Sequence, residues 1–382
     1  YISGVGQSEV GVRLTRSPLG LTMDAIKAAM ADAGLTFDQI DGVATYPGRM
    51  ATFLGFSPVG VDEVIETCGI KARWHMGGGE IPAQLSAIAE AADAVRNGHA
   101  RHVICFRTVY EAAALSRPEE FPPLRREFVD GLSQWTAPYF AISAACWVGQ
   151  YAMRQMKRNG MTREQLAQIA LNANRNALAN PNARNITKKQ LTLDEYMEAR
   201  PITTPFCLYD CDRFSDASTV VIVSAGDALD EIKTTPIRIA ATAGSVHRYS
   251  WDQPDYMASY ATGPDLWSKT DYRPKDVDTV QFYDGFAFFP ISWLEALGFC
   301  EVGEGHKFIE GGTRIARDGE LPLNTGGGQL GAGRLHGFGF AYEAALQLRG
   351  DAGERQIPGD PKVAVATSGG GPLAAALLLA RD

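Results

Sequence analysis

Long apolar runs are missing from this sequence, and no stretch of it reaches the length that a transmembrane helix requires. The residues after Tyr1 also lack the basic and then apolar pattern of a secretory signal. Excess positive charge is missing as well, because 36 Lys and Arg residues face 44 Asp and Glu residues, for a net charge of −8. Such a chain has no overall electrostatic attraction to nucleic acid or to anionic lipid. We therefore expect a cytoplasmic protein that binds neither nucleic acid nor membrane.

Cysteine is scarce and scattered. The six cysteines are Cys68, Cys105, Cys146, Cys207, Cys211 and Cys300. Only Cys207 and Cys211 are close in sequence, and no second pair of potential ligands accompanies them, so the spacing does not indicate a zinc site. We expect reduced thiols that mostly pack, and no metal in this chain.

Strand and helix patterns alternate along the first half of the chain. Four short apolar segments read as strands: Tyr1–Gly6, Ile40–Ala44, His102–Phe106 and Ser218–Ser224. Between them, Thr22 is expected to cap a helix that closes at Gly34, and a second helical stripe begins near Ile81. Strands and helices in this rhythm predict an α/β fold with a right-handed parallel sheet.

A second set of elements begins after a connector at residues 225–235. It contains strand patterns at Ile237–Ala241, Thr279–Phe282 and Lys362–Thr367, with helices between them. We therefore predict two similar α/β halves in one chain, residues 1–235 and 236–382, although no sequence repeat is visible. Two stretches break the rhythm: residues 116–135, interpreted as a surface excursion or lid, and the aromatic-rich residues 247–272, interpreted as an irregular insertion.

The stretch Leu323–Glu343 has the most unusual composition. Seven glycines lie between Gly326 and Gly339, and two side chains that can carry charge, Arg334 and His336, stand among them. A helix is expected from about Phe340. A glycine-rich loop that leads into a helix offers backbone N–H groups to an anion or oxyanion, but glycine runs also serve plain turns.

Three stretches resemble the motifs of one family in order and spacing. These are Tyr283–Ala287, Asn324–Gly339 and Thr367–Gly371, with further support from Cys211–Ser218. The chain resembles the thiolase superfamily, in its sterol-carrier-protein-x or lipid-transfer-protein-like branch. The resemblance implies a layered αβαβα architecture and a homodimer.

The departures from the thiolase pattern concern its reactive side chains. Met76–Ile81 offers no thiol where thiolases carry the acylated cysteine, and Thr367 or Ser368 replaces the cysteine of the terminal loop. Arg334 stands in place of the family's histidine, and Tyr283 heads the loop that starts with Asn or His in thiolases. Thiolysis is covalent acyl transfer and requires those cysteines, so we expect no thiolysis.

The resemblance then implies a lyase. Members of this branch are associated with retro-aldol cleavage of β-hydroxyacyl-CoA thioesters in steroid side-chain catabolism, together with a small OB-fold, zinc-ribbon partner. It implies an acyl-CoA substrate, CoA bound only as part of that substrate, and no covalently bound cofactor. Two alternatives stay open: a condensing or acyltransferase variant, and a catalytically silent acyl-CoA or lipid binder that scaffolds the partner. The aromatic residues within 247–272 fit either a wall for a steroid or a contact with another chain.

Candidate site residues follow from the matched loops. Tyr283 is the candidate base, with Arg334 as the cation that lowers its pKa; the plain alternative is a core aromatic. His336 is a candidate proton carrier or oxyanion donor, and Asp284 orients the loop or serves structure alone. Backbone N–H groups that hold the thioester are expected at six glycines: Gly78, Gly79, Gly327, Gly328, Gly369 and Gly370.

Overall fold

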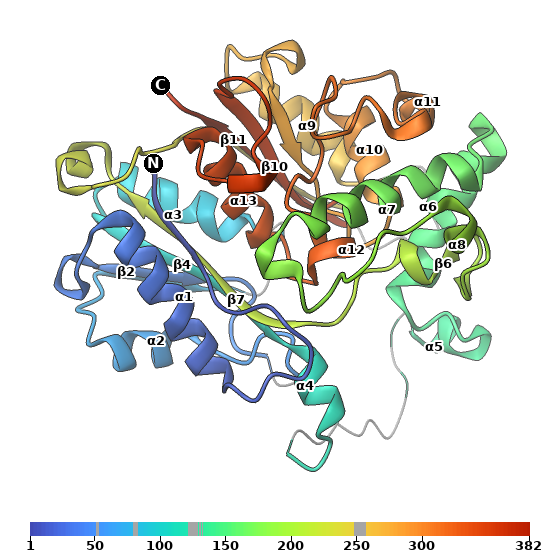
Figure 1. Ribbon diagram of the computed structural model, residues 1–382. Coiled ribbons are helices and arrows are strands. Elements are labelled where there is room, and N and C mark those ends of the chain that lie inside the picture. The colour runs from blue at the N-terminus through green and yellow to red at the C-terminus, as the bar shows by residue number, and fades with distance from the viewer. Residues whose placement is uncertain (51–52, 79–82, 121–128, 130, 132, 248–256) are drawn as a thin grey trace.

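The structure is a computed structural model that describes residues 1–50, 53–78, 83–120, 129, 131, 133–247 and 257–382. Within these residues the main strands form two sheets (Figure 1). In spatial order, the first sheet contains β1 (Ile2–Gln7), β7 (Asp216–Ser224), β4 (His102–Tyr110), β2 (Gly42–Thr45) and β3 (Trp74–Gly77). The second contains β8 (Arg238–Val246), β11 (Leu373–Ala380), β10 (Val363–Gly369) and β9 (Thr279–Gln281).

Both sheets are mixed, so the prediction of a parallel sheet is wrong in part. The pairs β2–β3, β2–β4 and β9–β10 are parallel, whereas β7 runs antiparallel to β1 and β4, and β11 to β8 and β10. The reason for the last case is local. Only Gly370–Pro372 separates β10 from β11, and a connection this short can join only antiparallel neighbours.

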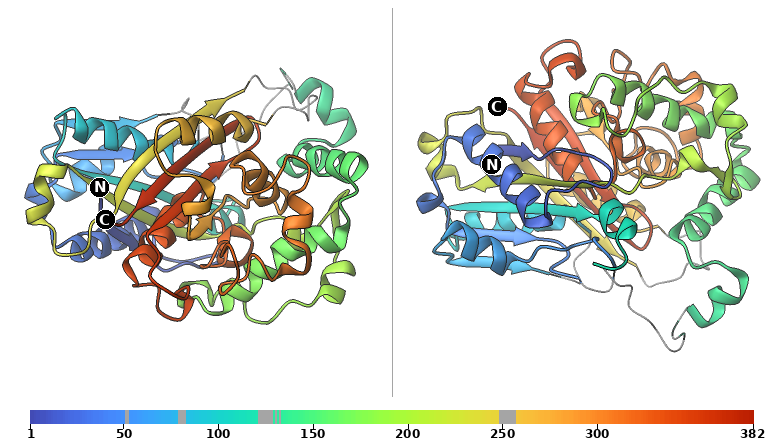
Figure 2. Two further views of the ribbon diagram at one scale, coloured as in Figure 1. Left: turned by 90° about the horizontal axis from the view of Figure 1, so that it is seen from above. Right: turned by 60° about the horizontal axis from the view of Figure 1, so that its bottom comes forward.

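Helices lie in three layers around the two sheets (Figure 2). Between the sheets lie α3 (Ser86–Arg96) and α13 (Phe338–Arg349), which share one apolar core with the inner faces of both. The outer face of the first sheet is covered by α1 (Pro18–Ala33) and α2 (Val61–Cys68), and that of the second by α9 (Ser259–Ser268) and α10 (Phe288–Ala296). The layered αβαβα architecture is confirmed.

Small residues set the spacing between these layers. At Gly6 of β1, an added Cβ would lie 2.3 Å from the Ala25 carbonyl oxygen of α1, so the helix rests directly on the strand backbone. The strands of the first sheet come from residues 2–224 and those of the second from residues 238–380. The division into halves near residue 235 itself stays a prediction.

Several element boundaries differ from the expected ones. Helix α1 begins at Pro18 with Ser17 as its N-cap, and the Thr22 hydroxyl donates instead to the Pro18 carbonyl within the helix. Its end at Gly34 is confirmed. Helix α3 begins at Ser86, five residues after the expected start, and residues 79–82 lie outside the described part of the chain.

A long excursion between β4 and β7 carries most of the remaining helices. They are α4 (Glu111–Ser116), α5 (Ser133–Thr136), α6 (Ala144–Asn159), α7 (Arg163–Leu178) and α8 (Leu193–Met197), followed by the short strand pair β5 (Pro201–Thr203) and β6 (Phe206–Cys207). The sequence patterns Thr162-x-x-Gln165 and Thr192-x-x-Glu195 predict capping boxes, and the structure confirms both at the starts of α7 and α8. Much of the predicted lid at 116–135 falls on residues that are not described.

The second half has two further short helices, α11 (Gly305–Phe308) and α12 (Gly328–Ala332). The stretch 247–272, expected to be irregular, contains α9, which packs against β8 and β11; residues 248–256 are outside the description. Gly263 and Pro264, which have low helix propensity, lie inside this helix, and its Leu266 and Thr262 are buried. In the described residues, no helix has both the length and the apolar character needed to span a lipid bilayer.

Candidate active site

An apolar-walled cavity lies where the excursion between β4 and β7 meets the ends of the second sheet. It measures about 440 Å³ and is lined by Tyr283 after β9, Gly369 at the end of β10, Arg334 after α12, and Asp212 from the segment between β6 and β7. Its apolar wall includes Val148, Ile202, Phe214, Phe286, Phe289 and Leu373. The structure thus brings Tyr283 and Arg334 together, as the matched loops predicted, and adds Asp212.

The Tyr283 phenol stands among aromatic rings, with Phe289 at 5.7 Å and Phe340 at 6.3 Å between ring centroids. Its backbone N–H donates to Thr367 Oγ1 at 2.9 Å, which ties the two matched loops together. Burial, and then the Asp212 carboxylate, raise the pKa of Tyr283 to about 12, although Arg334 opposes the shift. Arg334 thus lowers the pKa of Tyr283 as expected, but burial and Asp212 outweigh it, so the phenol is protonated at neutral pH; the assignment of Tyr283 as the base stays a prediction.

Arg334 is held in the cavity wall by two carboxylates. Its Nη1 lies 3.5 Å from Glu111 Oε1, and its Nε lies 3.5 Å from Asp212 Oδ2. The guanidinium also rests over the Phe214 ring, 5.1 Å from the centroid. Burial alone would lower the pKa of Arg334, but the two carboxylates outweigh it, so the cation persists. These contacts show that Arg334 is part of the cavity wall and not an exposed surface charge.

His336 lies behind Arg334 and is not among the described residues that line the cavity. Its Nδ1 is 3.2 Å from Nη2 of Arg107, and its Nε2 is 3.4 Å from Oε2 of Glu111. Because a guanidinium can only donate, Nδ1 accepts and the proton resides on Nε2. Burial, Arg334 and Arg107 lower the pKa of His336 far below its usual value, so the ring is neutral. His336 therefore does not line the cavity, and it contacts Arg107 and Glu111 of the charged cluster instead.

Glu111 and Arg107 belong to this cluster and were not predicted. Arg107 lies on β4 and Glu111 starts α4 directly after it, and both side chains are buried. Burial raises the pKa of Glu111, while Arg334 and Arg107 counteract the rise. The sequence does contain a signal: two residues of opposite charge, four positions apart, follow an apolar strand that we expected to end at Phe106. The strand continues instead to Tyr110.

Asp284 serves the loop rather than the cavity. Its Oδ1 accepts the backbone N–H of Gln329 at 2.7 Å, at the start of α12, and it is absent from the described cavity lining. Burial is the main reason that the pKa of Asp284 rises to about 7. A Cβ on Gly328 would lie 2.0 Å from Asp284 Oδ2, and Gly328 has φ +58°. Any side chain at position 328 would therefore clash with the Asp284 carboxylate.

Helix α7 holds the rest of the glycine-rich loop. Its Asn172 amide donates to the Leu323 carbonyl at 2.8 Å, and Asn180, just after the helix, donates to the Gly326 carbonyl at 2.8 Å. A Cβ on Gly327 would lie 2.6 Å from that of Ala177. Gly327 and Gly328 therefore permit close packing, which favours the plain-turn interpretation over thioester binding for these two residues.

The other predicted glycines divide as follows. Gly369 lines the cavity, whereas Gly370 is fitted against Phe289, which would lie 2.8 Å from an added Cβ. The Gly78 N–H is directed to Met76 Sδ at 3.1 Å, and Gly78 is not among the described lining residues. Gly79 lies outside the described residues, so its predicted oxyanion role stays a prediction.

The positions of the thiolase cysteines hold no thiol in this cavity. Ala83 and Gln84 line it just before α3, and the Ser368 hydroxyl accepts the Leu85 N–H at 3.1 Å. Cys211 is the one cysteine among the described lining residues, and we had not predicted it there. Burial, with Asp210 and Asp212, raises the pKa of this thiol to about 12, so it does not supply a thiolate at neutral pH.

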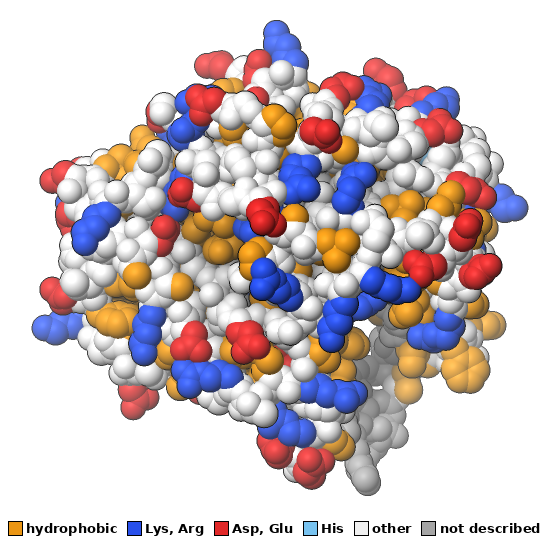
Figure 3. Space-filling model, viewed as in Figure 1, with side chains coloured by type: hydrophobic (Ala, Val, Ile, Leu, Met, Phe, Trp, Pro, Cys, Tyr) orange, Lys and Arg blue, Asp and Glu red, His pale blue; other side chains and the backbone are white. Residues whose placement is uncertain are grey.

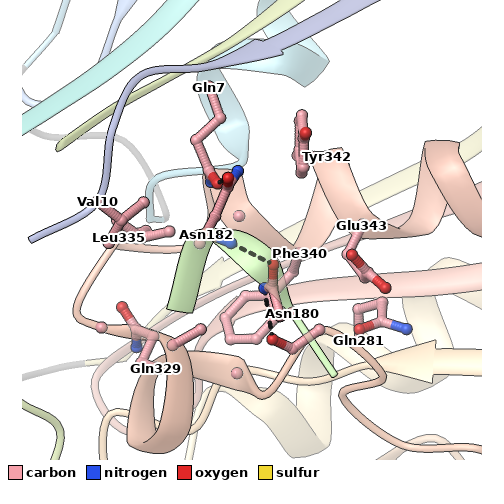
Figure 4. A pocket seen from close by; sticks show the side chains of 16 residues that line it. Gln7, Val10, Asn180, Asn182, Gln281, Gln329, Leu335, Phe340, Tyr342 and Glu343 are labelled. Atoms are coloured by element: carbon pink, nitrogen blue, oxygen red, sulfur yellow. Dashed lines mark hydrogen bonds between the residues drawn. The ribbon is translucent and has the colours of Figure 1, made fainter. Parts of the chain in front are cut away.

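A second cavity lies on the other side of the glycine-rich loop (Figure 4). Its volume is about 30 Å³, the space of about one water molecule. Asn182 donates to Gln7 Oε1 at 2.8 Å beside it, and Gln329, which also lines it, accepts the His336 backbone N–H at 2.7 Å. This small cavity cannot admit an acyl-CoA, so the cavity lined by Tyr283 and Arg334 is the candidate active site. Across the described residues, no group of three or more His, Cys, Asp or Glu side chains is arranged to hold a metal.

Comparison with known proteins agrees with this geometry. The family model "Thiolase C-terminal domain-like" matches residues 243–380. Human mitochondrial 3-ketoacyl-CoA thiolase, 16% identical, superposes with a TM-score of 0.70 over 100% of this chain and 98% of that chain. The two-sheet fold with its cavity at the strand ends is thus the thiolase fold.

More similar proteins define the branch. A "17-hydroxy-3-oxo-4-pregnene-20-carboxyl-CoA lyase" of Mycobacterium tuberculosis is 30% identical, with 91% of each chain covered. A "Steroid side-chain-cleaving aldolase" of Thermomonospora curvata is 29% identical over 100% of this chain and 97% of the relative. A solved "Ltp2-ChsH2(DUF35) aldolase" has a TM-score of 0.87 at 28% identity, covering 100% of this chain and 97% of that one. The chain belongs to the thiolase superfamily, in the lipid-transfer-protein-like branch that includes these lyases.

Proposed function

We propose that this protein, a lyase of the thiolase superfamily, cleaves a carbon–carbon bond of a β-hydroxyacyl-CoA thioester by a retro-aldol reaction. One observation carries the proposal. The cavity of a thiolase fold here holds a protonated phenol, a guanidinium and a carboxylate at Tyr283, Arg334 and Asp212, where thiolate chemistry would need cysteines. Such a set can move protons and balance negative charge, but it cannot form an acyl-enzyme at neutral pH.

The proposed chemistry follows from this set. Loss of the proton from the β-hydroxyl group lets the carbonyl of the leaving fragment form, while the Cα–Cβ bond breaks with its electron pair going to Cα. The remaining fragment is a thioester enolate. The Tyr283 hydroxyl is the donor that can protonate it, and the fixed positive charge of Arg334 lowers the energy of the anion in a site of low dielectric.

The proposed substrate has a bulky, steroid-like acyl group. The cavity is walled by the aromatic rings of Phe214, Phe286 and Phe289, and its volume of about 440 Å³ falls in the range of sites that bind drug-sized molecules. The names of two relatives point the same way, since one is a steroid side-chain-cleaving aldolase and the other a 17-hydroxy-3-oxo-4-pregnene-20-carboxyl-CoA lyase.

The proposed assembly includes a homodimer and a small OB-fold, zinc-ribbon partner. Apolar side chains on and after α5 support a contact with another chain: Trp135, Tyr139, Phe140 and Ile142 are 66–85% exposed. Figure 3 shows apolar side chains at the surface over this helix. The solved relative carries the name of two components, Ltp2 and ChsH2(DUF35), which supports a partner for this chain too.

Product analysis tests the proposed function. The purified protein, alone and with a candidate partner, is incubated with β-hydroxyacyl-CoA thioesters that carry either a steroid ring system or a linear chain. We expect the ring-bearing substrate to yield a ketone or aldehyde and a shortened acyl-CoA, both identified by mass. A matched reaction with a 3-ketoacyl-CoA and free CoA is expected to give no thiolysis. Thiolysis, or binding of both thioesters without turnover, contradicts the proposal; the second result favours a silent scaffold.

A further inference from the structure

Asp212 is the acidic side chain that opens to the cavity. Among the described lining residues the ionisable ones are Cys211, Asp212, Tyr283 and Arg334, and Asp212 is the only carboxylic acid. Its side chain is 11% exposed. Glu111, the other carboxylate of the cluster, is 8% exposed behind Arg334 and does not line the cavity among the described residues.

The backbone fixes Asp212 to the loop that carries Tyr283. The Asp212 N–H donates to the Gly285 carbonyl at 3.1 Å, and the Ala287 N–H donates to the Asp210 carbonyl at 2.9 Å. The two segments therefore run side by side, with Cys211 and Phe286 paired as an antiparallel bridge. The Asp212 carboxylate and the Tyr283 phenol also act on each other electrostatically. Their relative position is set by backbone hydrogen bonds rather than by flexible side chains.

The carboxylate has spare capacity to accept a proton. Its ion pair with Arg334 Nε spans 3.5 Å, which is longer than a hydrogen bond, so this contact orients the carboxylate without occupying its lone pairs fully. Burial, with a smaller contribution from Glu111, raises the pKa of Asp212 to about 6, while Arg334 restrains the rise. A carboxylate with such a pKa is ionised at neutral pH and is a stronger base than an ordinary aspartate.

The other ionisable groups near the cavity lack either access to it, an ionised form at neutral pH, or a lone pair that can accept a proton. The phenol of Tyr283 and the thiol of Cys211 are protonated at neutral pH, because the pKa of each lies at about 12. The neutral His336 ring uses Nδ1 for Arg107 and directs Nε2 towards Glu111, away from the cavity lining. Arg334 carries no lone pair that can accept a proton.

The geometry points to Asp212 as the catalytic base that removes the β-hydroxyl proton, an assignment that rests on the retro-aldol function proposed above. The proton then has a closed path. Asp212 takes it as the Cα–Cβ bond breaks, and the enolate carbon takes the phenolic proton of Tyr283. The phenolate recovers a proton from the Asp212 carboxylic acid. Both side chains return to their starting states, and no further reactant is needed.

Rate measurements across pH test this assignment on the intact protein, with its partner if cleavage requires one. The variants are Asp212→Asn, Asp212→Glu and, as a matched control, Asp271→Asn at an exposed site outside the cavity. We expect kcat/KM of the wild type to fall on the acid side with an apparent pKa of about 6. Asp212→Asn is expected to lower kcat by about 10²–10⁴-fold and to remove that fall from the residual activity. Asp212→Glu is expected to keep the acid-side fall and more activity than the Asn variant.

Thermal unfolding and binding of the product acyl-CoA show whether each variant is folded with an intact pocket. The assignment is overturned if folded Asp212→Asn cleaves at the wild-type rate with the acid-side fall unchanged, while the wild type forms the expected products. Absence of cleavage by the wild type is a different result, read from product masses, and overturns the proposed function together with the assignment. A loss equal in the Asn and Glu variants and in Asp271→Asn also overturns it, because that pattern reports general damage.

Discussion

At the scale of single residues, the burial of Tyr283 decides its role. The phenol is charged only when its proton is lost, and burial disfavours that state, which holds its pKa at about 12. The hydroxyl faces the cavity and keeps its proton there, so it is available as a donor. Tyr283 is thus suited to give a proton to an enolate and unsuited to take one from an alcohol at neutral pH.

Removal of that hydroxyl tests the role. Tyr283→Phe keeps the ring and its aromatic contacts, so we expect kcat to fall by about 10²–10⁴-fold while the thermal midpoint barely moves. The matched control is Tyr272→Phe, which removes a hydroxyl that lies 3.3 Å from Arg238 and outside the cavity lining. Near-wild-type activity of Tyr283→Phe, measured by steady-state kinetics, would show that another group protonates the product.

The charge of Arg334 has a separate consequence for pH dependence. Its cation favours the ionised form of Asp212 and so lowers the pKa of that carboxyl. In Arg334→Met this contribution is lost, the pKa of Asp212 rises above about 6, and we expect the acid-side fall of kcat/KM to move to higher pH. Arg96→Met, at an exposed position, is the control. A fall that stays in place or moves to lower pH contradicts the arrangement of these charges.

At the scale of elements, the sequence predicted correctly the helix caps and helix ends that depend only on neighbouring residues. The capping boxes at Thr162 and Thr192 and the end of α1 at Gly34 follow from short-range chemistry and are confirmed. The antiparallel placement of β7 depends on how a long excursion returns to the sheet, which periodicity does not encode. Gly263 and Pro264 likewise lower the helix propensity of α9, and its packing against β8 and β11 outweighs this effect.

The start of α12 gives a stability test at this scale. Gly328 and Gly350 both have positive φ, +58° and +80°, but an added Cβ meets Asp284 Oδ2 at 2.0 Å only at Gly328. Gly350→Ala is expected to cost about 1–2 kcal/mol for its left-handed backbone. Gly328→Ala adds overpacking and displaces the cap of α12, for a total of about 2–5 kcal/mol. Denaturant unfolding measures both, and equal losses would show that Asp284 is not fitted to Gly328.

At the scale of the whole molecule, the site is assembled from segments that are far apart in sequence. Tyr283 and Arg334 were predicted because they lie in loops that resemble family motifs. Asp212 lies in the matched stretch Cys211–Ser218, but nothing in that stretch alone shows that it faces the same cavity. Arg107 and Glu111 join the cluster only because β4 ends beside the glycine-rich loop. The loops of the site were therefore predictable and their electrostatic partners were not.

The expected homodimer is tested through the edge of the first sheet. Strand β3 is an outer strand of that sheet, and His75 on it is exposed, so its free edge can pair with a second copy. We expect light scattering to give twice the mass of the chain at micromolar concentration. His75→Lys places a charge on this edge and is expected to weaken the dimer, whereas His99→Lys, exposed outside the strand, is not. A monomeric wild type contradicts the proposed assembly.

The most direct test of the central claim is to run the cleavage in D₂O without added CoA and to weigh the shortened acyl-CoA by mass spectrometry. A retro-aldol reaction passes through an enolate whose new Cα–H bond takes its hydrogen from exchangeable groups of the site. We expect one deuterium at Cα of the product, above the level that the product acyl-CoA gains when incubated alone with the protein, and an unchanged protein mass. A product without deuterium, cleavage that requires free CoA, or an acyl adduct on the protein would contradict the account.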